Sequence, residues 1–309
     1  MAELLTLKNL FICAYEKNVD ELKNVIECLI NKEKKDNMSS LMVEKEKKRY
    51  DILKDYLDAN RNNILHFAIY GNNIDNVKFI ITNSNLLNSV NIDEQNGLII
   101  SILNRNNDIC KYLIEQNINY NQKDKYGANA ILYSLITKNY DLFNILIEKK
   151  NIDINVNSFD KGNLISICIF ERNIKLLKKL FSKNIVPEIK KSIYPHPIIY
   201  ILYNDNNNND LLYLYLTYFL FYYTRNEDLY KINLINFDFN NDQICISLDN
   251  KQLISTILKN KSYDLNAFNN ILNLTDENNT ALCDICKNNN NTVGEAILSY
   301  YMSDIAQTN

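Results

Sequence analysis

Apolar residues follow five asparagines of the chain at one spacing, four, seven and eight positions after each. This spacing places the apolar side chains on one face of an α-helix. Asn is a preferred N-cap, because its side-chain oxygen accepts a hydrogen bond from a free backbone N–H of the first turn. The pattern therefore predicts five amphipathic helices, each beginning just after its asparagine. These asparagines are Asn18, Asn73, Asn106, Asn139 and Asn173.

A small residue stands five positions before each of these asparagines. We expect it to lie on a short preceding helix, at 64–70 or 130–137 for example, where a small side chain lets neighbouring helices approach closely. From the second member onward the column repeats at intervals of 33, 33 and 34 residues. An insertion of about 22 residues separates its first two members. The column consists of Cys13, Ala68, Ser101, Ser134 and Cys168.

Each unit is therefore predicted to be a helix, a tight turn, a second helix and a loop. One such unit cannot bury its own apolar face, whereas stacked units share a continuous core. A repeat interval in this range is typical of a solenoid.

Several segments resemble the ankyrin repeat family. Residues 63–68 (Asn-Ile-Leu-His-Phe-Ala) resemble its Thr-Pro-Leu-His-x-Ala box, and residues 280–283 look like another copy. Residues 108–115 resemble the second-helix signature, and residues 117–121 and 151–155 resemble the Gly-Ala-Asp-x-Asn segment. The resemblance implies an all-α fold, an ankyrin-repeat α-solenoid of about seven or eight helix–turn–helix units that diverge in the C-terminal third.

The chain departs from the family pattern at the turn between the two helices of a unit. The family has Gly there and this chain does not, and the Pro of the box is also absent. We expect each repeat to be less stable than a consensus repeat for this reason. The residues in place of Gly are Lys17, Asn72, Arg105, Lys138 and Arg172.

Three segments are expected along the chain. Residues 1–55 form an N-terminal capping repeat with a charged insertion at about 31–50, residues 56–190 form regular repeats, and residues 191–309 form divergent repeats and a C-terminal cap. The insertion mixes Lys and Arg with Glu and Asp, which is typical of a solvated helix or linker.

Charge and composition exclude several classes of protein. A net charge of −3 argues against binding of nucleic acid, which needs clustered cations. The start of the chain lacks the basic region of a signal peptide, and the longest apolar run is too short for membrane insertion. Seven scattered cysteines are typical of reduced thiols in a cytoplasmic protein.

The residues offer no catalytic constellation, so we expect no enzyme, no cofactor and no metal. The only histidines are His66, placed in the box where the family histidine makes turn hydrogen bonds, and His196, between two prolines. Cys283 and Cys286 form a single C-x-x-C without the second ligand pair of a zinc site. An enzyme within 191–309 is a remaining but disfavoured hypothesis.

The resemblance implies that a partner binds along a concave face formed by the loop tips and the exposed side of each first helix. Tyr126, Phe159 and Phe170 are the preferred anchors, because exposed aromatic residues commonly supply interface hot spots. The alternative is that these three pack against neighbouring loops. Carried over by position, the partner-binding residues are Asn60, Asn62, Tyr70, Asp93, Gln95, Asn104, Lys125, Tyr126, Thr137, Phe159, Asp160, Phe170 and Glu171.

The sequence thus predicts a non-catalytic protein–protein interaction module that acts as a cytoplasmic monomer and binds another protein. An alternative is an adaptor or host-manipulation factor. In that case the repeats bind a target, and residues 191–309 recruit a ligase or another enzyme.

Overall fold

The computed structural model describes residues 2–16, 18–36, 50–186 and 280–288, with single positions 197, 200, 201, 211 and 215. The chain divides into two compact units, Met1–Ser158 and Phe159–Asn309. Residues 37–49 of the predicted insertion, and most of the predicted divergent repeats in 191–309, lie outside the described residues.

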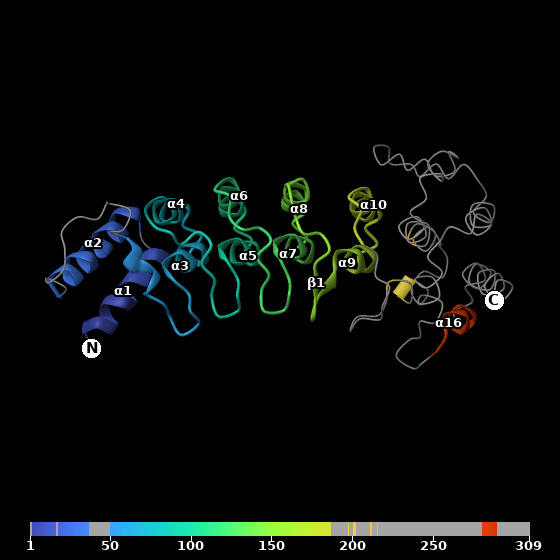
Figure 1. Ribbon diagram of the computed structural model, residues 1–309, viewed down its shortest axis with the longest axis horizontal. Helices are drawn as coiled ribbons and strands as arrows, with labels where there is room; N and C mark the ends of the chain where they lie inside the picture. The colour runs from blue at the N-terminus through green and yellow to red at the C-terminus, as the bar shows by residue number, and fades with distance from the viewer. Residues whose placement is uncertain are drawn as a thin grey trace. The chain divides into compact units, whose positions relative to one another are not determined.

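The first unit is a stack of helix pairs, as predicted. First helices α1, α3, α5 and α7 pack side by side in one row, and second helices α2, α4, α6 and α8 pack in another (Figure 1). The loops between pairs project beyond the row of first helices. The elements are α1 (Ala2–Glu16), α2 (Val19–Asp36), the 3₁₀-helix η2 (Asp51–Lys54), α3 (Ile64–Tyr70), α4 (Ile74–Asn83), α5 (Gly97–Leu103), α6 (Asn107–Glu115), α7 (Ala130–Ile136), α8 (Tyr140–Ile147) and strand β1 (Asn157–Ser158).

Among the described residues of the second unit there is one further pair of the same kind. Its described elements are β2 (Gly162–Asn163), α9 (Leu164–Phe170), α10 (Ile174–Ser182) and α16 (Leu282–Asn288). α9 and α10 pack against each other. Described helices of this unit therefore repeat the pattern of the first.

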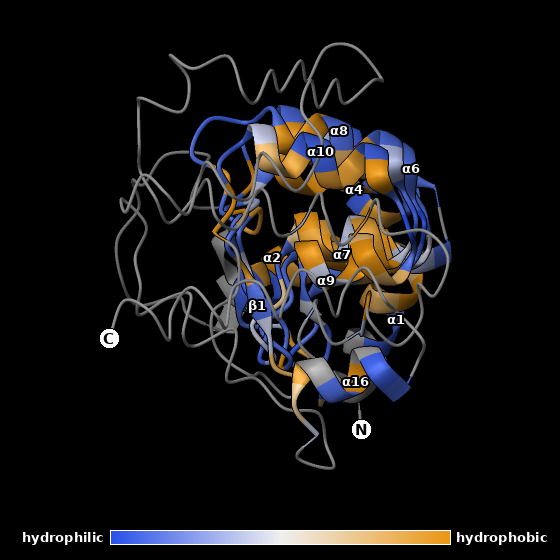
Figure 2. Ribbon diagram, turned by 90° about the vertical axis from the view of Figure 1, so that its right-hand side faces the viewer, coloured by the Kyte–Doolittle hydropathy of each residue, from blue (hydrophilic) through white to orange (hydrophobic). Residues whose placement is uncertain are grey.

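The predicted column of small residues lies in the core of each unit. Ala68, Ser101 and Ser134 are fully buried, and Cys168 is buried in the second unit. The two serine hydroxyls donate hydrogen bonds to the carbonyl oxygens of Leu98 and Ile131, three residues back, at 2.8 and 2.7 Å. Figure 2 shows the matching pattern on α6 and α8, hydrophobic toward the first helices and hydrophilic outside.

Four of the five predicted asparagine caps are confirmed. The side-chain oxygens of Asn18, Asn73, Asn139 and Asn173 accept backbone N–H groups of the first turn that follows. The prediction for Asn106 is wrong, since its side chain makes no cap hydrogen bond. Because Asn106 is buried beside the preceding repeat, its amide instead donates to the carbonyl oxygen of Ile69 at 2.6 Å.

The turn between the two helices of a pair keeps the conformation that glycine favours, although glycine is absent. Asn72, Arg105 and Lys138 have φ angles of 52°, 59° and 58°, and Arg172 in the second unit has 51°. A non-glycine residue in this left-handed region costs about 1–2 kcal/mol. The structure therefore gives a physical basis for the expected loss of stability per repeat.

Candidate functional site

Three loops of the first unit share one internal hydrogen-bond pattern, and we call residues 58–62, 91–95 and 124–128 the tip loops. The first residue of each is Asp58, Asn91 or Asp124, and its side-chain oxygen accepts the N–H groups two and four positions further on. These six distances lie between 2.7 and 3.0 Å. Asx residues fix turns in this way, so each tip loop is held in one conformation.

Successive tip loops are joined to one another. The N–H of Ile92 donates to the carbonyl oxygen of Asn60 at 2.8 Å, and the N–H of Lys125 donates to that of Asp93 at 3.0 Å. The ammonium of Lys125 also pairs with the Asp93 carboxylate at 2.7 Å and lies 4.9 Å from the centre of the Tyr126 ring. The hydrogen bond to Asp93 raises the pKa of Lys125. The tip loops thus form a continuous edge of the first unit.

A second column of asparagines, which sequence reasoning did not use, connects the first helices to the loops. Asn63, Asn96 and Asn129 cap α3, α5 and α7, and their side-chain oxygens accept N–H groups of the first turn. Their side-chain amides donate across to Ser89 Oγ, Asn119 O and Asp153 O at 2.6, 2.8 and 2.9 Å. The signal for this column was the same 33-residue interval.

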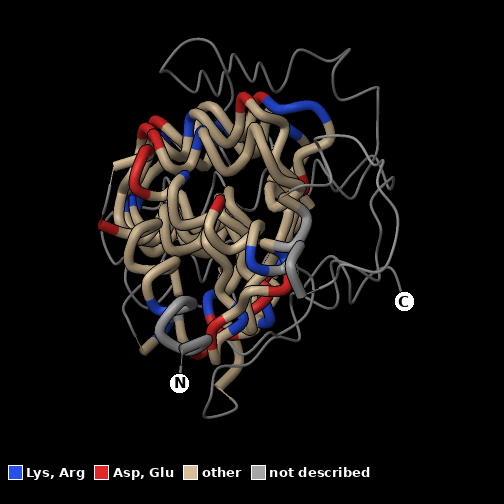
Figure 3. Tube along the Cα trace, turned by 90° about the vertical axis from the view of Figure 1, so that its left-hand side faces the viewer, with Lys and Arg blue, Asp and Glu red and all other residues tan. Residues whose placement is uncertain are grey.

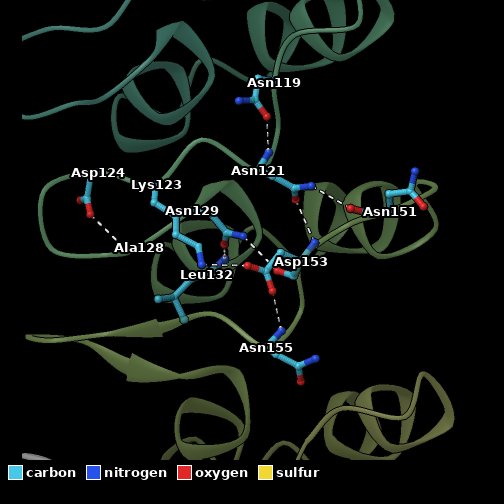
Figure 4. A network of polar contacts seen from close by, with 10 residues as sticks. All are labelled: Asn119, Asn121, Lys123, Asp124, Ala128, Asn129, Leu132, Asn151, Asp153 and Asn155. Atoms are coloured by element: carbon cyan, nitrogen blue, oxygen red, sulfur yellow. Dashed lines mark hydrogen bonds and ion pairs between the residues drawn. The ribbon is translucent and has the colours of Figure 1, made fainter.

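A ladder of polar contacts links one loop to the next at the far end of each repeat (Figure 4). Asn121 accepts the N–H of Asp153 at 2.8 Å, and its amide donates to the carbonyl oxygen of Asn151 at 2.7 Å. One repeat earlier, Asn88 accepts the N–H of Asn119 at 2.8 Å. These contacts, two exposed and one half-buried, join the loop of one repeat to the loop of the next.

Exposed apolar residues occupy one position of the first helices. Tyr15, Tyr70 and Leu103 are 45%, 36% and 41% exposed, and the half-buried Ile136 takes the same place in α7. We call these four residues the apolar row. Each stands two positions after the small residue, so the repeat interval could have predicted the row, but sequence reasoning identified only Tyr70 from it.

Tyr70 links the apolar row to the tip loops. Its hydroxyl bonds the side chain of Asn91, the first residue of a tip loop. Burial raises the pKa of Tyr70, and the nearby carboxylates of Asp58 and Asp93 act in the same direction. Two further apolar side chains lie at the tips, since Ile92 is 53% exposed and Tyr126 is 41% exposed.

The predicted partner-binding residues differ in how far their side chains are exposed to solvent. In the first unit Asn62 is buried, and its N–H and amide bond Asp58, so it holds the tip loop instead of facing solvent. In the second unit the half-buried Phe170 packs edge-on against Tyr200 with ring centres 4.2 Å apart. Of the others, the exposed ones are Asn60, Tyr70, Asn104, Lys125, Tyr126, Phe159 and Asp160, and the half-buried ones are Asp93, Gln95, Thr137 and Glu171.

Three titratable groups in the core, His66, Cys110 and Cys168, are held in their neutral forms. Burial lowers the pKa of His66 to about 4, and its Nδ1 accepts the N–H of Asn63 while Nε2 lies 3.3 Å from the carbonyl oxygen of Ser89. The predicted turn role of His66 is thus confirmed. Burial raises the pKa of the Cys110 thiol to about 11 and raises that of Cys168 as well, so neither thiol is an activated nucleophile.

Two searches of the described part of the chain gave negative results. There, no three His, Cys, Asp or Glu residues come together as a metal site would require. None of the helices described is both long enough and apolar enough to span a bilayer. The side chains of His196, Cys283 and Cys286 lie outside the described set.

A comparison with known protein families agrees with this architecture. A family model of ankyrin repeats matches residues 65–158 as three copies. The crystal structure of the human ASB11 ankyrin repeat domain is similar, with 15% sequence identity, a TM-score of 0.45, and coverage of 68% of this chain and 82% of that one. A search of curated protein sequences gave no significant match. The chain therefore contains ankyrin repeats, which the family model matches as three copies over residues 65–158.

Proposed function

We propose that the chain is a non-catalytic module that binds another protein along the face formed by the apolar row and the tip loops of the first unit. Ankyrin repeats are in general protein–protein interaction modules. The observation that carries the proposal is the apolar row, in which three successive first helices expose an apolar side chain at the same position.

Single exposed apolar residues are normal on a protein surface and need no explanation. The apolar row differs because its members belong to helices that pack side by side, α1 on α3 and α3 on α5. Their side chains therefore fall in line, and the exposed tips Ile92 and Tyr126 add to the same face of the repeats. Aligned apolar and aromatic side chains, two of them Tyr, are typical of the centre of an interface.

Rigidity of the tip loops also supports binding. Side-chain oxygens of Asp58, Asn91 and Asp124 fix these loops from within, and one backbone hydrogen bond joins each loop to the next. Association is weakened by every loop that must be ordered on binding. Loops that are already fixed avoid that cost, which favours a recognition role.

We further propose a cytoplasmic, monomeric protein. The four cysteines whose side chains the structure describes, Cys13, Cys28, Cys110 and Cys168, are thiols and not disulfides. Free thiols are the usual state in a reducing compartment. Analytical ultracentrifugation of the full chain under reducing conditions tests the monomer, and a concentration-dependent dimer would contradict it.

The binding face is tested with two variants that each add one charge. Leu103→Glu changes the apolar row, whereas Ile145→Glu changes an equally apolar residue of α8, 36% exposed, in the row of second helices. The immobilised full chain is used for affinity capture with quantitative mass spectrometry. We expect Leu103→Glu to reduce captured partners about tenfold or more, as hot-spot changes do, while Ile145→Glu retains them. Equal capture by both variants, with circular dichroism showing both folded, would exclude this face.

A further inference from the structure

The first helices that carry most of the apolar row contain no charged residue. α3, α5 and α7 consist of apolar residues with one Gly, one His, two Ser and two Tyr among them. A partner side chain that became buried against these helices with a charge would find no counter-ion, and an unpaired buried charge is strongly destabilising. This face therefore favours a partner segment that has no charged side chain where it contacts the apolar row.

The spacing of the row selects a conformation for that segment. Packed helices lie about 8–10 Å apart, so the row offers one side chain about every 8–10 Å. A β-strand repeats side chains on one face about every 6.8 Å, and an α-helix does so about every 5.4 Å. A polyproline II segment repeats a face every third residue, about 9.3 Å. Of these three repeats, that of polyproline II lies within the range of the helix spacing, so each successive side chain of the segment meets the next helix.

The aromatic content of the face points the same way. Tyr15 and Tyr70 stand in the row, the ring of Phe67 packs edge-on against Tyr70, and Phe67 stacks on Phe11 with ring centres 4.5 Å apart. Aromatic-lined grooves are what proline-rich segments use for docking. Proline lacks a backbone N–H, so such a segment presents mainly carbonyl acceptors, and Tyr hydroxyls are suitable donors.

We infer that the apolar row and the adjacent tip loops bind an uncharged, proline-rich segment of a partner protein, in the polyproline II conformation, with an apolar side chain at every third position. This inference rests on the proposed function, because it names the partner chemistry for the same face. Each apolar side chain of the segment would pack between neighbouring members of the row, and the tip loops would flank the segment.

Fluorescence anisotropy with labelled peptides and the full chain tests this inference. The first peptide has about twelve residues, four turns of polyproline II, with Leu at every third position and Pro between. A second has the same composition with the leucines placed together, a third has Glu at every third position, and a fourth is an amphipathic helix. We expect the first peptide to bind at least about tenfold more tightly than each of the others.

Variants locate the peptide on the chain. We expect Leu103→Ala and Tyr70→Ala to weaken binding of the first peptide about tenfold, and Ile145→Ala to leave it unchanged. Because Tyr70 contacts Asn91 and Phe67, Tyr70→Phe is included as a variant that keeps the ring. Tyr70→Phe should bind within about threefold of the wild type if the ring supplies most of the contact.

The inference is overturned if the helical or the clustered peptide binds as tightly as the first, or if the first peptide fails to bind. Preferential binding of the Glu peptide would overturn it as well. If affinity capture depends on Leu103 while the first peptide does not bind, the proposed function stands and this inference fails. If capture is also independent of Leu103, both fail.

Discussion

The two rows of helices in the first unit have the same repeat interval and the same core, but opposite exposed sides. First helices α3, α5 and α7 have no charged residue and expose apolar side chains at their ends. Second helices expose charges, among them Asp75 and Lys78 of α4 and Asp108 and Lys111 of α6. Figure 3 shows the charged residues mainly along the second helices and around the loops, with few between.

Charges on the second helices also link one repeat to the next. Lys23 of α2 lies 5.6 Å from the ring centre of Phe79 on α4, and Lys78 of α4 lies 5.8 Å from that of Tyr112 on α6. Because its charged side chains have partners on the same surface and remain hydrated, this face is stable when it is exposed to water. An uncharged face with exposed Tyr and Leu gains free energy when it is covered, at roughly 25 cal/mol for each Å² of apolar surface removed from water. The difference between the rows therefore separates the solvated side of the repeat from the binding side.

Acid should change this comparison most, because the first helices α3, α5 and α7 are uncharged only while His66 is neutral. Burial lowers the pKa of His66 to about 4 in the folded chain, below its ordinary value of 6.5. The unfolded chain thus binds the proton more readily, and stability that is complete above pH 6.5 is lost as pH falls from about 6.5 toward 4. The loss approaches about 3 kcal/mol.

Urea unfolding at a series of pH values, for the wild type and His66→Asn, measures this term. The variant should be less stable at pH 7 but should lose about 3 kcal/mol less than the wild type on acidification, since the other titrating groups are common to both. Parallel pH curves for the two proteins would show that His66 is not protonated on unfolding.

Removing an asparagine cap should destabilise the chain more in a first helix than in a second helix. Both losses of stability should be smaller than the loss caused by acid. Asn129 caps the first helix α7, is fully buried, and also donates to the carbonyl oxygen of Asp153 in the next loop. Asn139 caps the second helix α8 and is half-buried, and the hydrogen bond that its amide donates to Asn107 Oδ1 at 2.7 Å is exposed to solvent. We expect Asn129→Ala to cost about 2–3 kcal/mol, since a cap and an inter-repeat bond are lost. Asn139→Ala should cost about 1 kcal/mol.

Chemical unfolding of both variants tests this difference, with hydrogen exchange of the 151–155 loop as a second measure. Exchange in that loop should increase for Asn129→Ala and not for Asn139→Ala, because only Asn129 bonds Asp153. Equal costs and equal exchange would mean that Asn129 acts as a helix cap alone.

The sequence predicted what depends on a single helix, and it failed where the neighbouring repeat decides. The small column and four second-helix caps follow from spacing along one chain segment, and they are confirmed. Asn106 has the same spacing but lies against Ile69 of the repeat before, which offers its amide a different partner. Burial of Asn62, whose side-chain amide donates to Asp58 within the tip loop, likewise did not follow from its position in the repeat.

Substitutions by Gly in the turn between the two helices of a pair should give the smallest change in stability. The sign of this change depends on backbone strain in the folded chain and on the entropy of the unfolded chain. Arg105 has a φ of 59°, which costs a residue with a side chain about 1–2 kcal/mol. Glycine removes that cost but adds about 0.5–1 kcal/mol of unfolded-state entropy, so Arg105→Gly should stabilise the chain by about 0.5–1 kcal/mol.

Asn72, at 52°, tolerates this conformation better, and Asn72→Gly should change stability little. Lys111→Gly, inside α6, should destabilise by about 1 kcal/mol. Urea unfolding of the three variants measures all these changes, and a loss of stability in Arg105→Gly would mean that its side chain stabilises the turn by more than the backbone strain it causes.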